Sequence, residues 1–99
     1  MKTFTEKVYE IVKKVPKGKV ISYQKIAIKL GDKNKARAVG NVLHKNKDPE
    51  VPCHRVVNSK GFLSKKFAFG GIEVHKMRLE REGIEVFDGY RVSIETHSM

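Results

Sequence analysis

Residues 22–45 read SYQKIAIKLGDKNKARAVGNVLHK, and this stretch decides the fold because it encodes two short helices joined by a tight turn. Ser22 is a good N-cap for a helix that runs to Leu30. The polar run 31–34 predicts the turn, and a second helix is expected from about Lys35 to Lys45. The side chains that should face inward are Ile26, Ala27, Leu30, Ala36, Val39 and Leu43. Two such helices, the second one basic, are typical of a helix-turn-helix, although many helical hairpins of this kind bind nothing.

A further helix is expected before this unit. Thr3 and Glu6 have the spacing of a capping box, and the Pro-Lys-Gly run at 16–18 should end the helix. Its apolar face consists of Phe4, Val8, Ile11, Val12 and Val15. The apolar pair 20–21 then predicts a short extended segment.

The second half of the chain begins with a loop from Lys47 to Gly71, in which Val56-Val57 is the best candidate for a short strand. Loops of this length usually carry functional sites. A fourth helix is expected over residues 71–82, with Gly83 as its C′ residue. Its buried side chains should be Ile72, Val74 and Met77.

The C-terminal segment alternates apolar and polar residues at 84–86 and 90–94, on either side of Asp88-Gly89. This pattern predicts a β-hairpin over residues 84–95. The whole chain, residues 1–99, is therefore expected to form one α+β domain: a small winged-helix-like helix-turn-helix unit with an active-site loop, a packing helix and a C-terminal β-hairpin.

The charge balance points to a polyanionic partner. The 99 residues include 21 Lys and Arg against 11 Asp and Glu, a formal net charge of +10. Such a field attracts nucleic acid, although a solvated lysine-rich surface would have the same composition. No apolar run reaches the length of a membrane span, and a single cysteine with no export signal favours a cytoplasmic protein, nucleoid-associated or nuclear in a eukaryote.

The single cysteine lies in the run Pro52-Cys53-His54-Arg55-Val56. A thiolate is a strong nucleophile, a neighbouring imidazole is the usual base that generates one, and a nearby arginine favours the charged form. The alternative is that Cys53 is a small buried hydrophobic residue. One cysteine and four scattered histidines do not form a metal site, and no glycine-rich phosphate loop is present, so no metal and no cofactor are expected.

This motif and its flanks resemble the O6-alkylguanine-DNA alkyltransferase family, in the C-terminal domain that binds DNA and carries the active site. The similar segments occur in the family's order and with similar spacing over roughly residues 4 to 86. They are Gly18-Lys19-Val20-Ile21-Ser22-Tyr23, Ala36-Arg37-Ala38-Val39-Gly40, Asn46, residues 52–57, Gly61 and Arg81-Glu82-Gly83.

The resemblance implies a catalytic role for four residues. Cys53 would be the nucleophile and alkyl acceptor, and His54 would remove its proton through a water molecule. Glu82 would orient and charge the imidazole, and Asn46 would brace the active-site turn. The backbone carbonyls of Cys53 and Val56 would accept hydrogen bonds from the amino group of the guanine.

The same resemblance implies how the base is reached. Arg37 would enter the base stack and fill the space that the flipped base leaves. Tyr23 would rotate the phosphate and hydrogen-bond the flipped base. In the family the helix-turn-helix enters the minor groove, where small residues at Ala38 and Gly40 suit close packing. The polar side chains of Lys33, Lys35, His44 and Lys45 could contact the DNA backbone or simply be solvated.

Two departures from the family pattern bear on function. The chain starts at the first helix of the DNA-binding part, so no N-terminal accessory domain is expected. After Gly61 the loop is longer than in active alkyltransferases and lacks their Tyr-Ser pair, which makes it more similar to alkyltransferase-like proteins. Those proteins bind and flip alkylated guanine without repairing it. The loop's three aromatic residues, Phe62, Phe67 and Phe69, could line a roomy pocket or pack in the core.

The sequence therefore predicts direct, single-turnover transfer of the alkyl group from O6-alkylguanine to Cys53, with double-stranded DNA as the partner and a monomeric protein. The alternative is an alkyltransferase-like lesion-binding protein that flips the base and recruits excision-repair proteins.

Overall fold

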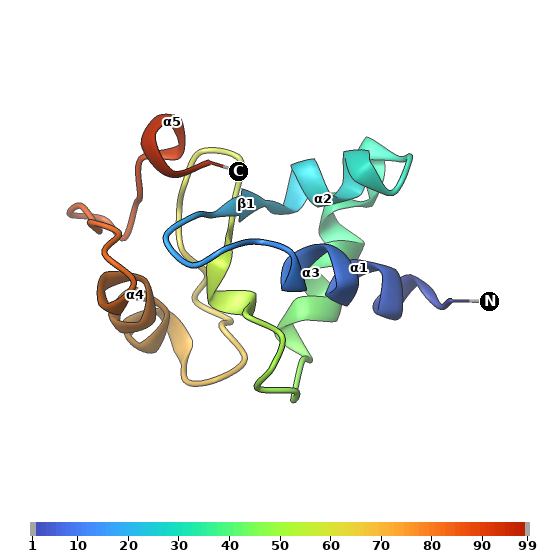
Figure 1. The fold of residues 1–99 in the computed structure, drawn as a ribbon, viewed down its shortest axis with the longest axis horizontal. Helices are drawn as coiled ribbons and strands as arrows, with labels where there is room; N and C mark the ends of the chain where they lie inside the picture. The colour runs from blue at the N-terminus through green and yellow to red at the C-terminus, as the bar shows by residue number, and fades with distance from the viewer. Residues whose placement is uncertain (1, 99) are drawn as a thin grey trace.

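The computed structural model describes residues 2–98 as a set of short helices arranged around one pair of strands. Figure 1 shows the first three helices on one side of the molecule and α4 and α5 on the other. The elements in chain order are α1 (Phe4–Lys13), β1 (Ile21–Ser22), α2 (Tyr23–Lys29), the 3-10 turn η1 (Lys33–Lys35), α3 (Ala36–His44), the 3-10 turn η2 (Cys53–Arg55), β2 (Val56–Val57), α4 (Gly71–Arg81) and α5 (Ile94–His97). None of the described helices is long and apolar enough to cross a membrane.

The N-terminal half forms as its local signals predict. The Thr3 side chain accepts from the Glu6 N–H, and the Glu6 side chain accepts from the Thr3 N–H, so the capping box is confirmed. Ser22 caps α2 by accepting from the Lys25 N–H at 3.0 Å. The helix-turn-helix is then α2, the turn around Gly31 and η1, and α3. Both predicted helices are therefore present.

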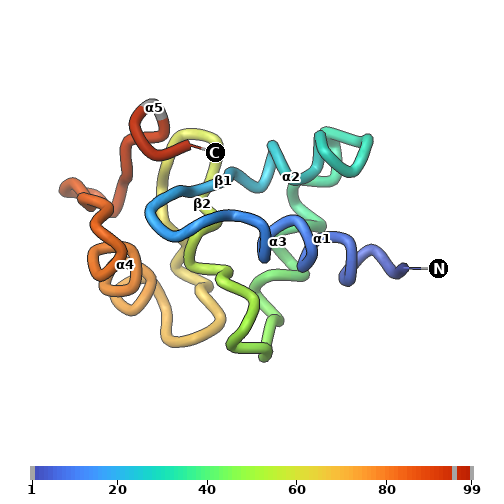
Figure 2. The backbone as a smooth tube through the Cα atoms, viewed as in Figure 1, coloured from blue at the N-terminus to red at the C-terminus, as the bar shows by residue number. Residues whose placement is uncertain are grey.

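The strand pair lies between two apolar cores (Figure 2). β1 and β2 are parallel, with Ile21 opposite Val56 and Ser22 opposite Val57. Because successive side chains on a strand point to opposite faces, Ile21 and Val56 join the core formed with α1, α2 and α3, and Val57 joins the second core. That second core is completed by Val20, Leu63, Leu79, Ile84 and Val92.

This pair also positions the site. Ser22 ends β1 and caps α2, so Tyr23 begins a helix directly beside the strand pair. The turn η2 runs directly into β2, which fixes Cys53 and His54 against the same pair. Tyr23 and Cys53, which are far apart in sequence, are thus both attached to the β1–β2 pair.

The predicted β-hairpin over residues 84–95 is wrong in its pairing. A tight turn does form at Asp88-Gly89, but it closes only one bridge, between Phe87 and Arg91. The segment after the turn pairs instead with the loop at residues 61–63, where the Val92 N–H donates to the Gly61 carbonyl at 2.9 Å and the Leu63 N–H donates to the Tyr90 carbonyl at 2.9 Å. Residues 94–97 are helical, not extended.

Two contacts explain this outcome. The Ile84 N–H donates to the Leu79 carbonyl, which ties residue 84 to the end of α4 and removes it from strand pairing. Pairing with the loop also buries Leu63 and Val92 together in the second core. Burial of apolar side chains far apart in sequence therefore outweighs the local alternation.

Helix α4 ends one residue earlier than predicted, and Gly83 follows in the expected C′ conformation with φ +85°. Its predicted buried face needs one correction, because Met77 is 41% exposed. His75 and Leu79 are the buried residues of the helix, and Ile72 and Val74 are partly buried. A buried histidine was not predicted, since its polar atoms need partners that only the fold supplies.

Candidate active site and DNA-binding surface

Cys53 lies at the start of η2 and is 5% exposed. Its N–H donates to the Val51 carbonyl at 2.7 Å, and its carbonyl accepts from the Val56 N–H, so the backbone around it is closely held. Burial raises the pKa of the Cys53 thiol, and the Asn46 side chain and the charge of Arg78 offset only part of this effect. The free protein therefore holds a neutral thiol, and a base must remove its proton.

His54 and Glu82 supply a base and a group that orients it. His54 Nε2 lies 2.9 Å from Glu82 Oε2, and both side chains are nearly buried. Burial alone would raise the pKa of Glu82, but hydrogen bonds from Arg55 and His54 outweigh it and lower that pKa to about 2. The carboxylate is therefore ionised at neutral pH and accepts the Nε2–H of the imidazole.

The second imidazole nitrogen is the one available for proton transfer. Among residues 2–98, His54 Nδ1 is a buried atom with no hydrogen-bond partner. With Nε2–H donated to Glu82, Nδ1 is unprotonated and can accept a proton. Burial lowers the pKa of His54, more than Glu82 raises it, so the ring is neutral when the reaction begins. This is the base-and-orienter arrangement of a nucleophilic triad.

Arg55 has a different role from the one expected. Its Nε and Nη2 donate to Glu82 at 2.9 and 2.7 Å, and its Nη1 donates to the Val15 carbonyl at 2.9 Å. The guanidinium is thus committed to fixing the carboxylate, and it does not serve to charge the thiol as predicted. The cation that lowers the thiol pKa is Arg78, on α4.

Asn46 lies where a brace is needed. It is 3% exposed, and its amide donates to the Asp48 carbonyl at 3.1 Å and to the Val51 carbonyl at 3.5 Å. Its Oδ1 accepts from the Asp48 N–H at 2.9 Å. These bonds hold the segment that leads into the active-site turn.

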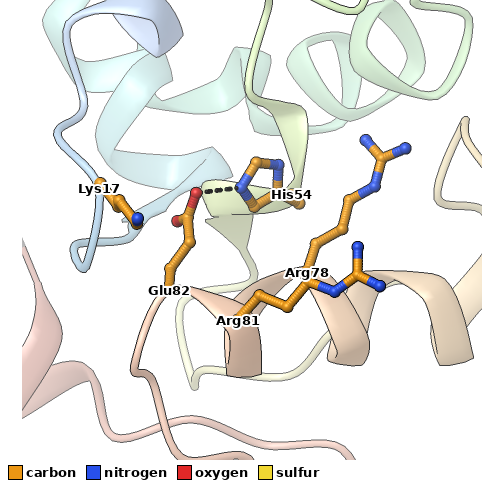
Figure 3. Close-up of a pocket in the computed structure, with 5 residues that line it drawn as sticks. All are labelled: Lys17, His54, Arg78, Arg81 and Glu82. Carbon is orange, nitrogen blue, oxygen red and sulfur yellow. Dashed lines mark hydrogen bonds and ion pairs between the residues drawn. The ribbon is translucent and has the colours of Figure 1, made fainter.

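Beside this site is a cavity of about 250 Å³, lined by Lys17, His54, Arg78, Arg81 and Glu82. Figure 3 shows His54 and Glu82 in contact, with Arg78 and Arg81 extending from α4 on one side and Lys17 on the other. Cys53 and Tyr23 do not line this cavity. It therefore opens onto the base and its carboxylate and not onto the thiol.

The predicted DNA-contacting residues are divided between the surface and the interior. Arg37, the second residue of α3, is exposed, and its guanidinium forms no ion pair with the described residues. Ala38 is half-buried. Gly40 is buried, and a Cβ there would lie 3.8 Å from the Tyr23 ring and from His44. These are ordinary van der Waals distances, so the packing of the free protein does not require glycine at position 40, and its role toward DNA stays a prediction.

Tyr23 is the first residue of α2, and its hydroxyl lies 3.4 Å from Nε2 of His44. Burial raises the pKa of Tyr23, so its hydroxyl is neutral and can donate. Val56 is fully buried in β2, backbone included, so the contact of its carbonyl with a guanine stays a prediction.

The aromatic residues of the loop at 62–70 do not share one role. Phe67 is buried and stacks on His75, with ring centroids 4.8 Å apart. Phe69 is half-buried, and the Arg78 guanidinium lies over both Phe67 and Phe69. Phe62 is 40% exposed and pairs with Arg91 instead. The core interpretation therefore holds for Phe67.

Sequence reasoning did not assign Ser64, His75 and Arg78 to the site. Ser64 Oγ lies 2.9 Å from His44 Nε2, and His75 Nε2 lies 2.8 Å from the His54 carbonyl. The serine had one available signal, since it falls in the loop that follows Gly61. Among the side chains that the structure describes, no group of three or more from His, Cys, Asp or Glu could hold a metal ion.

Comparison with known proteins identifies close relatives. Residues 3–84 match the family described as 6-O-methylguanine DNA methyltransferase, DNA binding domain. Alkyltransferase-like protein 1 of Schizosaccharomyces pombe is 42% identical over 88 residues, which are 88% of this chain and 82% of that protein. The crystal structure of S. pombe Atl1 with damaged DNA containing O6-carboxymethylguanine is similar with a TM-score of 0.86 and 37% identity, over 100% of this chain and 98% of that one.

A second kind of relative is named as an enzyme. The methylated-DNA–protein-cysteine methyltransferase of Kluyveromyces lactis is 42% identical over 80 residues, which are 80% of this chain. This chain spans only 41% of that protein. The relatives therefore include both transferases and an alkyltransferase-like protein.

Proposed function

The chain belongs to the 6-O-methylguanine DNA methyltransferase family by its DNA-binding domain, and from this membership we propose that it repairs O6-alkylguanine in duplex DNA by transferring the alkyl group to Cys53. The observation that carries the proposal is that the two residues after the cysteine, His54 and Arg55, both hydrogen-bond to Glu82. A protein that only binds a lesion has no need of a nucleophile followed by an oriented base.

The chemistry follows from these groups. The Cys53 thiol loses its proton to His54 Nδ1 through a water molecule, since Nδ1 has no hydrogen-bond partner in the free protein, while Nε2–H stays bonded to Glu82. The sulfur attacks the alkyl carbon, so that the S–C bond forms as the C–O6 bond breaks. The electron pair goes to the guanine, which takes up a proton and becomes an ordinary base. The ionised Glu82 stabilises the imidazolium that forms in this step.

The thioether that results is not reversed by any group in this site, so each molecule acts once. The step needs no cofactor, because nothing is oxidised or reduced. Transfer has two requirements. The neutral, buried Cys53 thiol must be deprotonated, and the lesion must be brought to it.

The helix-turn-helix would bring the lesion. An exposed Arg37 at the start of α3 is free to enter the base stack, where its planar guanidinium can stack as a lysine could not. Tyr23 presents a neutral hydroxyl near the active-site turn. Double-stranded DNA is the partner that fits these features and the net charge of +10. The relative that was solved with damaged DNA supports the same partner.

The second candidate function is lesion binding without transfer, followed by recruitment of excision-repair proteins. The alkyltransferase-like relative favours it, because its similarity covers nearly the whole of both chains. The raised pKa of the thiol favours it as well, since an inert cysteine would have the same property.

The two functions differ in what happens to the lesion. A duplex with one O6-methylguanine would be incubated in excess over the protein at a series of protein concentrations, and its nucleosides would be quantified. The transferase proposal predicts that guanine replaces O6-methylguanine, with no more than one lesion repaired per protein molecule. A lesion that is bound tightly and recovered intact would favour the alternative.

A further inference from the structure

Ser64 is held from two sides by histidines of different helices. Its Oγ lies 2.9 Å from Nε2 of His44, the last residue of α3. Its N–H donates to Nδ1 of His75, in α4, at 3.2 Å. The loop at 62–70 is thereby attached both to the helix that carries Arg37 and to the packing helix.

The hydrogen bonds fix the state of the His75 imidazole. His75 Nδ1 accepts from the Ser64 N–H, so its proton is on Nε2, which donates to the His54 carbonyl at 2.8 Å. The His75 ring must therefore be neutral. On the other side, Ser64 Oγ accepts from the Lys66 N–H at 3.0 Å and keeps a proton that it can donate to His44 Nε2.

His75 connects the loop to the active-site turn. It is 1% exposed and stacks on Phe67 of the same loop. Its two hydrogen bonds join the Ser64 backbone to the His54 backbone, and the His54 side chain is in turn bonded to Glu82. No other described side chain links these two segments by hydrogen bonds to both backbones.

The position of Ser64 matters because Tyr23 is its neighbour. The Tyr23 hydroxyl lies 3.4 Å from the same His44 nitrogen that Ser64 contacts. One polar cluster therefore joins three parts of the protein: Ser64 of the loop, His44 of α3, and Tyr23, which is proposed to meet the flipped base. A shift of the loop would therefore change the polar contacts around the Tyr23 hydroxyl.

We propose that His44 and His75 are positioning residues that hold Ser64 and its loop beside Tyr23, and that the preference of the protein for alkylated over undamaged DNA depends on this two-histidine clamp. The proposal rests on the proposed function, since it assumes that the lesion enters next to Tyr23. It assigns neither histidine a contact with the reacting atoms.

The test uses two substitutions of the same residue. His75→Phe keeps the ring and its stacking on Phe67 but loses both hydrogen bonds, whereas His75→Gln keeps one donor and one acceptor. Dissociation constants would be measured in a Cys53→Ala background, which cannot remove the alkyl group, for a duplex with one O6-methylguanine and for the same duplex undamaged. We expect His75→Phe to lose about tenfold in lesion preference with unchanged affinity for undamaged DNA, and His75→Gln to recover most of it. His97→Gln, outside the cluster, is the matched control.

A readout independent of DNA checks the clamp itself. In ¹⁵N spectra of the free protein at neutral pH, we expect His75 as the neutral Nε2–H form. If His75→Phe does not fold, His44→Phe makes the same loss from the other side. Unchanged lesion preference in the folded variants, or the opposite tautomer at His75, would overturn the proposal. Absence of any lesion preference in the unmodified protein would instead refute the proposed function.

Discussion

His54 and Glu82, 28 positions apart in the chain, meet in a hydrogen bond of 2.9 Å between Nε2 and Oε2. This contact determines which imidazole nitrogen is free to take a proton. Arg55 holds the carboxylate from its other side and anchors it to the backbone of Val15. The base is therefore oriented by the packing of α4 against the active-site turn.

Glu82→Gln tests the need for a charge behind the base. The amide keeps the shape and can accept the Nε2–H of His54, but it cannot stabilise an imidazolium. We expect the single-turnover transfer rate to fall by about a hundredfold while lesion affinity stays within about twofold. Glu80→Gln is the matched control, because it removes the same charge from an exposed position of the same helix. Equal rates for the two variants would contradict the role given to Glu82.

Arg37→Ala tests the route by which the base leaves the stack. We expect the lesion-containing duplex to bind about ten- to a hundredfold more weakly, because the vacancy left by the flipped base is no longer filled. Lys33→Ala, also exposed and one turn away, should change affinity by only a few fold, equally for damaged and undamaged DNA. Titrations at fixed salt concentration would measure both. If both variants lost the same affinity for damaged and undamaged DNA, Arg37 would contact only the phosphate backbone, and its proposed role in the base stack would be wrong.

Folding stability should fall as the solution is acidified from about pH 6.5. Burial lowers the pKa of His75 from 6.5 to about 4, so the unfolded chain binds this proton first. Above pH 6.5 His75 is neutral in both the folded and the unfolded chain, and the free energy of unfolding is not reduced. As the pH falls toward 4, the unfolded chain takes up the proton and the free energy of unfolding decreases. At about 1.4 kcal/mol per pKa unit the effect is on the order of 3 kcal/mol.

Glu82 adds a second loss at lower pH. Its pKa of about 2 lies below the ordinary 4.5, so its contribution is present above pH 4.5 and disappears as the pH falls toward 2. Urea denaturation at a series of pH values would resolve the two steps. Burial also lowers the pKa of His44 and of His54, so these residues add to the first step in the same direction. His75→Gln should therefore reduce the first step and leave the second unchanged, and a first step of undiminished size in this variant would contradict the role given to His75.

Gly61→Ala should destabilise the fold more than Gly83→Ala. Both glycines have positive φ, +91° and +85°, so an added Cβ is strained at either position. At Gly61 the Cβ would also lie 2.3 Å from the Val92 carbonyl oxygen, whereas at Gly83 nothing lies within 4 Å. We expect a loss of about 1 kcal/mol at Gly83 and of roughly 3 kcal/mol or more at Gly61, measured by chemical denaturation. Similar losses would mean that the backbone of residues 90–92 can move away.

Signals contained in a few neighbouring residues predicted their structure correctly. The capping box at Thr3 and Glu6, the Ser22 cap and the C′ glycine at 83 each depend on contacts within one turn of helix. The strand at 56–57 was also predicted, because an apolar pair in a polar loop has few other ways to be buried.

Features that depend on distant partners were missed. The segment after Asp88-Gly89 alternates like a strand, but its partner is Gly61 and not residue 86. His75 is polar and was not expected inside, yet the His54 carbonyl and the Ser64 N–H satisfy both of its nitrogens. Arg55 follows Cys53 by two positions in sequence, but its charge is engaged by a carboxylate 27 positions away. The role of Glu82 was predicted only from the resemblance to the family, because the local sequence pattern by itself indicates a solvated side chain.

The central claim is that Cys53 accepts the alkyl group, and the most direct test is the intact mass of the protein after incubation with a duplex that contains one O6-methylguanine. The account predicts a gain of a single methyl group in place of hydrogen, mapped by peptide analysis to Cys53 and absent from Cys53→Ala, which should still bind the lesion. An unchanged mass in protein that binds the lesion tightly would contradict transfer and leave a lesion-binding protein with an unused thiol.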